Sequence, residues 1–386
     1  MSDVQLLFVV LAVLYGWECA CWLRRGSVAF SSWFGRGWQL FHPGALIGNQ
    51  RGGFIFAAPL PPLGWFVTAN QFPLSLSSDG VLAFVATNVN PAGRAAQSGR
   101  FIAWNDVRQV RARGRKVLVN GEVFLSLFSL SRANQLAEDL QRLAKLKPAQ
   151  REPAIAELLR DTLDAKTVER RWQEALPPAK PVRLLSNVLF VYLVAFAPVL
   201  IWQFGLRATW LNLLLGLLAL TATTAFFFRR AHFQLFPKAG DERFTHTLTI
   251  LLAPVTATRA HDALLRPLFE SFHPLAPAKV LLAEKDFREF ARRVLLDLRH
   301  PALPVCPDEK PEVKATELHG RNALRAAAEK FLKQAGLEPD SLCRAPAPLD
   351  ESCRAYCPRC EAQFTSADGQ CADCGGLALV KFPKRA

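Results

Sequence analysis

Two long apolar runs dominate the pattern of this chain, Leu184–Phe204 and Trp210–Phe228, and only residues 205–209 separate them. Each run is close to the ~20 residues that an α-helix needs to cross ~30 Å of hydrocarbon. A five-residue link suits two antiparallel neighbouring helices. The pattern therefore predicts a transmembrane hairpin.

A third apolar run, Val4–Leu23, ends at Arg24 and Arg25. The residues before it contain no Lys or Arg, and no A-x-A-like cleavage site follows it. We therefore expect a retained anchor and not a cleaved signal peptide. Three transmembrane helices are predicted, over 4–23, 184–204 and 210–228.

Basic residues flank the same side of all three runs. Residues 24–183 hold 22 Lys/Arg against 11 Asp/Glu, a net charge of +11 out of the +14 of the whole chain. Positive charge beside membrane helices marks the cytoplasmic side and favours contact with anionic lipid over nucleic acid. We expect the N-terminus outside and the C-terminus in the cytoplasm. The flanking residues are Arg24, Arg25, Arg36, Lys180, Arg183, Arg229, Arg230 and Lys238.

Between the first and second apolar runs the pattern changes to that of strands. The turn residues 77–80 separate two β-like runs, and Asn120-Gly121 lies between two others, which is the strongest short hairpin signal. A helix is predicted over 131–146, with an apolar stripe at helical spacing. Another is predicted over 153–176 and is stopped by Pro177, Pro178 and Pro181, so residues 149–183 form an amphipathic helical linker back to the membrane.

Hairpin strands followed by one amphipathic helix, with the phrase FIAWNDVRQVRARGRKVLVNG, resemble the bacterial pleckstrin-homology-like domain over about residues 73–147. The resemblance implies a β-rich cytoplasmic domain, over 37–147 if residues 37–72 supply its first strands. It implies binding of lipids, peptides or partner proteins, and several members of this family lie beside membrane helices. With the apolar runs, we expect a multi-pass protein of the bacterial inner membrane.

Five basic residues gather in this phrase. Arg111, Arg113 and Arg115 alternate and so are expected on one face of a strand, and Arg108 and Lys116 lie nearby. They are either contacts for anionic lipid headgroups or a solvated face of a sheet. Nucleic acid is disfavoured because no aromatic residues interleave with the arginines.

The region after the hairpin, 231–305, is mostly helical by pattern, clearest over Glu284–Leu298. Residues 245–254 fit a strand or a helix equally, and a further helix is predicted over 315–336. His246, His261 and His273 fall in this region. They would form a site only if the fold brought them together, and otherwise they are ordinary core or surface histidines.

The C-terminal segment CPRCEAQFTSADGQCADCGG carries the most specific motif. Two CxxC pairs, Cys357 with Cys360 and Cys371 with Cys374, supply four thiolates for a tetrahedral Zn²⁺ site. Iron in a rubredoxin-like site and free redox thiols are the alternatives, and Cys353 is a possible substitute ligand. Because protein would fill all four positions, the Zn²⁺ would be structural. CxxC pairs at this spacing indicate metal-bound thiolates and not disulfides, so the segment should face a reducing compartment.

The same segment resembles the zinc ribbon family over residues 353–380. Pro358 and Gly375 match the family pattern of the two metal-binding turns. Glu361 departs from it, because the family usually has glycine there.

Taken together, the sequence predicts an α+β multi-domain membrane protein. The first functional hypothesis is a scaffold or adaptor that presents cytoplasmic interaction modules to an unidentified protein partner. The second is a membrane-surface enzyme acting on a lipid or a membrane-bound substrate, although G-x-S-x-G, H-E-x-x-H, P-loop and G-x-G-x-x-G motifs are absent from the sequence. A transporter is disfavoured, because the predicted spans carry no charge in their middle.

Overall fold

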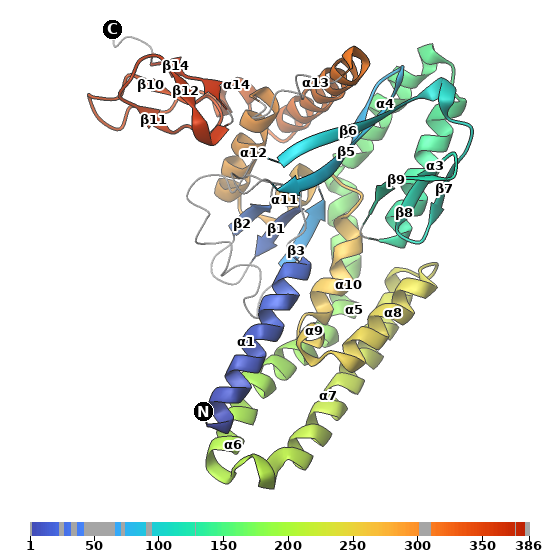
Figure 1. Cartoon of the computed structure of the whole chain (residues 1–386), viewed down its shortest axis with the longest axis vertical. Coiled ribbons are helices and arrows are strands. Elements are labelled where there is room, and N and C mark those ends of the chain that lie inside the picture. The colour runs from blue at the N-terminus through green and yellow to red at the C-terminus, as the bar shows by residue number, and fades with distance from the viewer. Residues whose placement is uncertain are drawn as a thin grey trace.

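The computed structural model describes residues 2–22, 27–31, 37–41, 66–70, 74–89, 95–127, 129–300, 310–374 and 376–382. Among the described residues, α1 is followed by the strands β1–β9, then by the helices α3–α14, and last by the short strands β10–β14 (Figure 1). The helices are α1 (Asp3–Trp22), α3 (Leu130–Lys145), α4 (Pro148–Thr162), α5 (Ala165–Val191), α6 (Ala197–Phe204), α7 (Leu206–Leu235), α8 (Gly240–Leu252), α9 (Pro254–Ala257), α10 (Ala260–Phe269), α11 (Leu275–Leu281), α12 (Glu284–Arg299), α13 (Pro311–Gln334) and α14 (Pro339–Leu342).

All strand pairs among the described residues are antiparallel. The sheets have the orders β2-β1-β3, β4-β5-β6, β7-β8-β9, β11-β10-β14 and β12-β13. The strands are β1 (Ser27–Ser31), β2 (Gly37–Phe41), β3 (Phe66–Asn70), β4 (Leu74–Leu76), β5 (Gly80–Val89), β6 (Ala95–Ala103), β7 (Val110–Arg113), β8 (Lys116–Val119), β9 (Glu122–Ser126), β10 (Ala355–Tyr356), β11 (Gln363–Phe364), β12 (Gln370–Cys371), β13 (Leu377–Ala378) and β14 (Val380–Lys381).

Within the described part of the chain, two helices are long and apolar enough to cross a membrane, Ala165–Phe204 and Leu206–Leu235. Gly205 alone joins them, so the five-residue link predicted over 205–209 is wrong. Its φ of +76° lies in the left-handed region, which glycine adopts without a steric penalty. In α1, the residues whose side chains are described form a shorter apolar segment, Asp3–Tyr15. The third membrane span therefore stays a prediction.

The prediction that prolines stop the linker helix is also wrong. The helix predicted over 153–176 is broken at Asp164, whose carboxylate caps α5 by accepting from the backbone N–H groups of Lys166 and Thr167 at 3.0 and 3.2 Å. From there α5 continues through all three prolines into the apolar run. A proline inside a helix costs about 3 kcal/mol, but α5 buries a continuous face against α7, α10 and α11, which outweighs that local cost.

The two apolar helices make close contact where small residues allow it. A Cβ on Gly216 of α7 would lie 2.7 Å from the Tyr192 hydroxyl oxygen, and that hydroxyl donates to the Leu213 carbonyl at 2.7 Å. Tyr192 begins a π-helical turn, Tyr192–Phe196, directly before Pro198. A π-helical turn of this kind accommodates the missing N–H of Pro198.

The β4–β9 region and α3 share one hydrophobic core. Trp104 is buried at its centre and donates from Nε1 to the Ser77 carbonyl at 2.8 Å, which fixes the predicted turn at 77–80. The predicted hairpin at Asn120-Gly121 is confirmed, since both residues have positive φ, at 53° and 88°, as a type I′ turn requires. The helix predicted over 131–146 is α3, and Ile155 of α4 packs into the same core.

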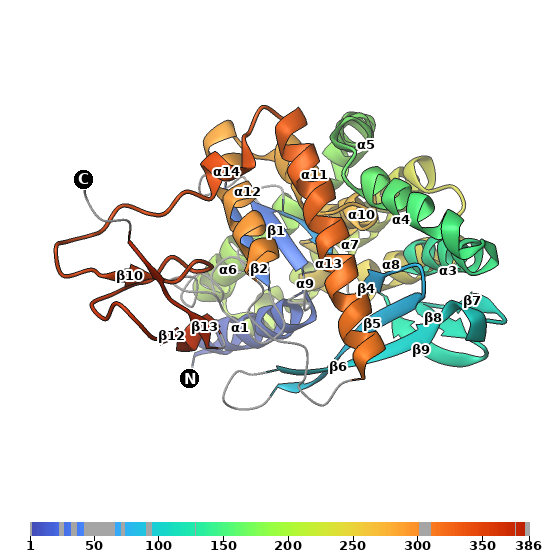
Figure 2. The same ribbon diagram turned by 90° about the horizontal axis from the view of Figure 1, so that it is seen from above.

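The helical region after α7 is built on a second, larger core. It extends from Leu189 and Phe228 of the apolar helices to Phe331 and Leu332 of α13. Helix α13 also crosses β4, where Gly320 allows Ser75 to approach within 2.7 Å of the position of a Cβ (Figure 2). Residues 245–254, open between strand and helix in sequence, belong mainly to α8, and the helices expected over 284–298 and 315–336 are α12 and α13.

Candidate metal centre

The C-terminal segment folds into short antiparallel strands that present two tight turns to each other. Cys357 follows β10 directly, and Cys371 ends β12. Cys360 and Cys374 lie three residues further on in each turn. Each CxxC pair therefore places its two thiols in one turn, and the two turns face each other.

The four sulfur atoms form a compact group. All four Sγ atoms of Cys357, Cys360, Cys371 and Cys374 lie within 4.8 Å of one another, and those of Cys360 and Cys371 are 3.6 Å apart. A tetrahedron with metal–sulfur bonds of ~2.3 Å has edges of about 3.8 Å. The geometry of the group can therefore hold one metal ion and is compatible with zinc.

The electrostatics of the thiols also favour a cation. Hydrogen bonds from the thiols of Cys360 and Cys374 lower the pKa of Cys357 strongly. Burial, and the neighbouring Cys360 and Cys357 groups, raise the pKa of Cys371 to about 11, and hydrogen bonding to the same two groups raises the pKa of Cys374. Four thiolates this close together repel one another, and a divalent cation compensates their charge.

The backbone of each turn has a residue in the left-handed region. Glu361 has φ +61° and donates from its N–H to the Cys357 carbonyl at 2.9 Å. In the second turn Gly376 has φ +87° and donates to the Cys371 carbonyl at 2.9 Å. A glycine at position 361 would adopt this conformation more easily. Gly375 lies outside the described residues.

The first turn is held against α12 by ion pairs, which the sequence did not predict. Arg359 donates from Nε to Asp297 Oδ1 at 2.9 Å. Glu361 pairs with Arg292, and Arg293 donates to the Arg359 carbonyl at 3.4 Å. The only hint of these contacts in the sequence is that two charged residues, Arg359 and Glu361, flank Cys360 and are not themselves candidate metal ligands. In Figure 1 the group of strands β10–β14 lies next to α12 and α14.

Cys353, the possible substitute ligand, is not one of the four clustered cysteines. Its thiol lies 3.5 Å from Asp350 Oδ1 and is partly exposed. The geometry favours the two CxxC pairs over this alternative.

The basic residues of the β7–β8 hairpin do not all share a strand face. All five predicted headgroup contacts, Arg108, Arg111, Arg113, Arg115 and Lys116, are exposed. The strand β7 includes Arg111 and Arg113, but Arg115 lies in the turn to β8, so the alternation predicted for all three arginines is wrong for Arg115. The tight turn at Gly114, with φ +59°, follows the end of the strand at Arg113, so Arg115 is no longer part of the strand.

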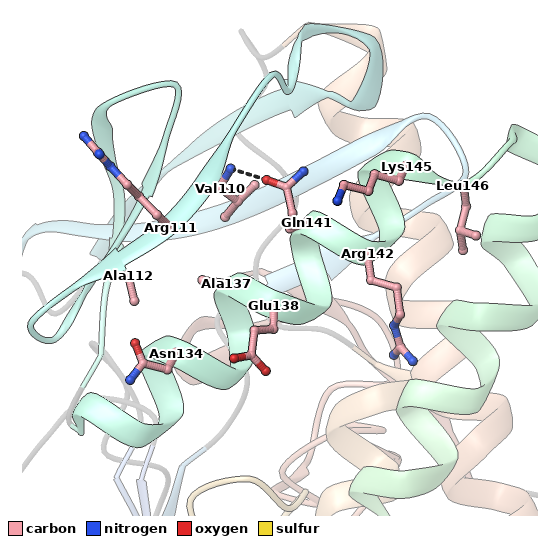
Figure 3. A pocket seen from close by; sticks show the side chains of 10 residues that line it. All are labelled: Val110, Arg111, Ala112, Asn134, Ala137, Glu138, Gln141, Arg142, Lys145 and Leu146. Atoms are coloured by element: carbon pink, nitrogen blue, oxygen red, sulfur yellow. Dashed lines mark hydrogen bonds between the residues drawn. The ribbon is translucent and has the colours of Figure 1, made fainter. Parts of the chain in front are cut away.

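A hollow of about 410 Å³ and another of about 570 Å³ lie beside α3. The larger one separates α3 from β7, an edge strand (Figure 3). Gln141 of α3 reaches across it and accepts from the Val110 N–H at 2.6 Å, whereas Arg111 points away from the helix. Side chains of α3 therefore make hydrogen bonds with only part of the backbone at the free edge of β7.

The three histidines have different neighbours. The Nε2 atom of His261 lies 2.8 Å from Asp262 Oδ1, and both side chains are fully buried. His273 is buried elsewhere, where its Nδ1 accepts from the Leu275 N–H at 3.3 Å. His246 packs on Phe228, with ring centroids 6.0 Å apart. These contacts fit ordinary histidines, two buried and one partly buried, better than one shared site.

No protein-family model, curated protein or solved structure matches this chain.

Proposed function

We propose that this chain is a membrane-anchored scaffold or adaptor of the bacterial inner membrane. Its membrane helices hold a β-rich domain and a zinc ribbon in fixed positions on the cytoplasmic side, where they bind a partner protein. The observation that carries this proposal is the core that joins Leu189 and Phe228 of the apolar helices to Phe331 of α13. Helix α13 of this core also contacts β4 of the β-rich domain, and α12 of this core pairs with the cysteine-containing segment through Asp297. Such a core favours modules fixed to the membrane anchor over modules on free linkers.

Zinc is the metal we propose for the four-cysteine group. Four thiolates in a tetrahedral arrangement suit Zn²⁺ and leave no open position for a substrate. The metal would stabilise a segment that is too short to bury a sufficient core. Its role is to keep the turn that contacts α12 in shape.

The β4–β9 sheets with α3 support our proposal of a pleckstrin-homology-like domain, since two antiparallel sheets precede one amphipathic helix. We propose that the partly open edge of β7 beside α3 accepts an extended segment of the partner. We further propose that the exposed side chains of Arg108, Arg111, Arg113, Arg115 and Lys116 contact anionic lipid headgroups.

The proposed topology has three spans, with α1 as the third, the N-terminus outside and the C-terminus in the cytoplasm. A reporter enzyme fused after Arg385 tests the orientation. Activity of a cytoplasm-specific reporter is the expected result. Activity only of a periplasm-specific reporter would overturn the proposed orientation.

Partner capture tests the scaffold proposal. We would purify the intact chain from membranes in mild detergent and identify the proteins that co-purify, then repeat this with Arg111→Glu and with Cys357→Ser. We expect one specific partner to be lost from at least one variant while the chain stays folded and in the membrane. Phospholipid turnover by the purified chain, abolished by His261→Ala, would instead establish the membrane-surface enzyme.

A further inference from the structure

Helix α8 runs antiparallel to α7, back toward the apolar run Trp210–Phe228 of α7. The Arg243 guanidinium lies over the Phe233 ring at 4.9 Å, and further along α8 the His246 ring packs on Phe228. Position along α8 therefore increases as position along α7 decreases. Figure 1 shows α8 returning beside α7 and leading to α9, close to α1.

Helix α9, which follows α8, lies at the same depth as the middle of the two apolar runs. Val255 of α9 is buried in a cluster with Leu11 of α1 and Leu193, and Leu217 of α7 packs against it. Leu193 is near the centre of the run Leu184–Phe204, and Leu217 is near the centre of Trp210–Phe228. A bilayer that covers both runs would therefore have Val255 near its midplane.

The segment that makes this return has a composition suited to hydrocarbon. Residues 244–258 contain no Asp, Glu, Lys or Arg. The stretch is too short to cross the bilayer, and its length is typical of a re-entrant or interfacial segment. The hydroxyls of Thr245, Thr247 and Thr249 each donate to the carbonyl four residues earlier, at 2.6–2.9 Å, so they need no water.

The outward face of α8 is apolar and uncovered. Phe244 is 69% exposed and Leu252 is 74% exposed, with Leu248 and Leu251 exposed between them. On α7, Phe233, whose ring lies beside Arg243 of α8, is 57% exposed as well. An uncovered apolar face of this kind, continuous with the face of a membrane helix, fits lipid acyl chains.

The break between α8 and α9 has its backbone groups satisfied by protein. The Ala253 carbonyl accepts from the Ala257 N–H at 2.9 Å. Ser186 of α5 donates from Oγ to the Ala257 carbonyl at 3.2 Å, and Thr258 donates to the Val255 carbonyl at 2.6 Å. Irregular backbone at membrane depth is tolerated only where protein covers it in this way.

We propose that α8 and α9 form a re-entrant segment that enters the bilayer from the cytoplasmic side, reaches about its middle and returns through α10. The outward face of α8, from Phe244 to Leu252, contacts lipid acyl chains. This inference rests on the proposed membrane anchoring of the chain. It adds a fourth element to the bilayer without adding a crossing.

Photo-cross-linking tests the lipid contact directly. The benzophenone amino acid p-benzoylphenylalanine replaces Phe244 or Leu252 in the full chain, which is reconstituted in phosphatidylethanolamine–phosphatidylglycerol vesicles and irradiated. Leu349, which is 82% exposed in the segment before the metal-binding turns, is the matched control. We expect mass spectrometry to detect lipid adducts at positions 244 and 252 and no lipid adduct at position 349.

Two outcomes would overturn the re-entrant segment. One is cross-linking of positions 244 and 252 to a second copy of the chain or to another protein. The other is no lipid adduct at either position while the chain stays in the membrane pellet after an alkaline carbonate wash. Release of the chain from that pellet would instead contradict the proposed membrane anchoring itself.

Discussion

Arg359, between Cys357 and Cys360 of the first CxxC turn, donates from Nε to Asp297 Oδ1 of α12 at 2.9 Å, and only 8% of Arg359 is exposed. This pair connects the metal centre to the helix whose other face forms part of the main core. A charge-assisted hydrogen bond with a buried member is stronger than an exposed ion pair. The pair therefore fixes the position of the ribbon on the rest of the chain.

Replacing Asp297 by alanine should detach the ribbon without removing its metal. The buried Arg359 guanidinium would lose its partner, at a cost of about 1–3 kcal/mol. We expect faster hydrogen exchange in residues 343–382 and unchanged metal content. The control is Glu157→Ala, which breaks an exposed pair with Arg160 and should change the free energy of unfolding by less than ~0.5 kcal/mol. Equal exchange rates in both variants would contradict the coupling.

The metal itself should depend on the four clustered cysteines and not on Cys353. Elemental analysis of Cys357→Ser should show loss of zinc, since three thiolates and a hydroxyl hold it poorly. Cys353→Ser should keep the zinc of the unmodified chain. Iron in the purified chain, or equal zinc loss in both variants, would contradict the assignment.

Glu361 should stabilise the ribbon through Arg292 at the expense of backbone strain. Both Glu361→Gly and Glu361→Ala remove the ion pair, but only glycine adopts φ +61° freely. We therefore expect the glycine variant to be about 1 kcal/mol more stable than the alanine variant toward denaturant. An alanine variant as stable as the glycine variant would show that this residue is not strained.

Acid should destabilise the helical region through His273. Burial lowers the pKa of His273 from 6.5 to about 4, and its unprotonated Nδ1 accepts from the Leu275 N–H. The unfolded chain binds the proton more readily, so stability should fall as pH drops from 6.5 toward 4 and level off below that. The loss can reach about 3 kcal/mol.

Denaturation at pH 7 and pH 4.5 measures this effect, with His273→Gln as the comparison. Glutamine keeps an acceptor and does not titrate in this range. The variant should lose less stability between the two pH values than the unmodified chain. The same loss in both proteins would assign the acid sensitivity to other groups.

Local patterns in the sequence were sufficient where one stretch of chain settles its own structure. Asn120-Gly121 predicts its hairpin because the positive φ values of a type I′ turn suit these two residues. The CxxC spacing predicts the metal group because each pair is closed by its own turn. In the same way, apolar length alone marked out the two helices that can cross a membrane.

Only the tertiary structure decided features that depend on contacts between distant residues. Helix α5 continues through three prolines because burial against α7, α10 and α11 outweighs the local penalty, and no pattern within 165–191 reports that burial. The ion pair of Arg359 with Asp297 joins residues far apart in the chain. The packing of α8 along α7 depends on contacts between two helices, such as that of Arg243 with Phe233. The sequence by itself determined the hairpin at Asn120-Gly121, the pairing of the cysteines in two turns and the two long apolar helices, whereas packing determined where the helices end and which contacts join distant elements.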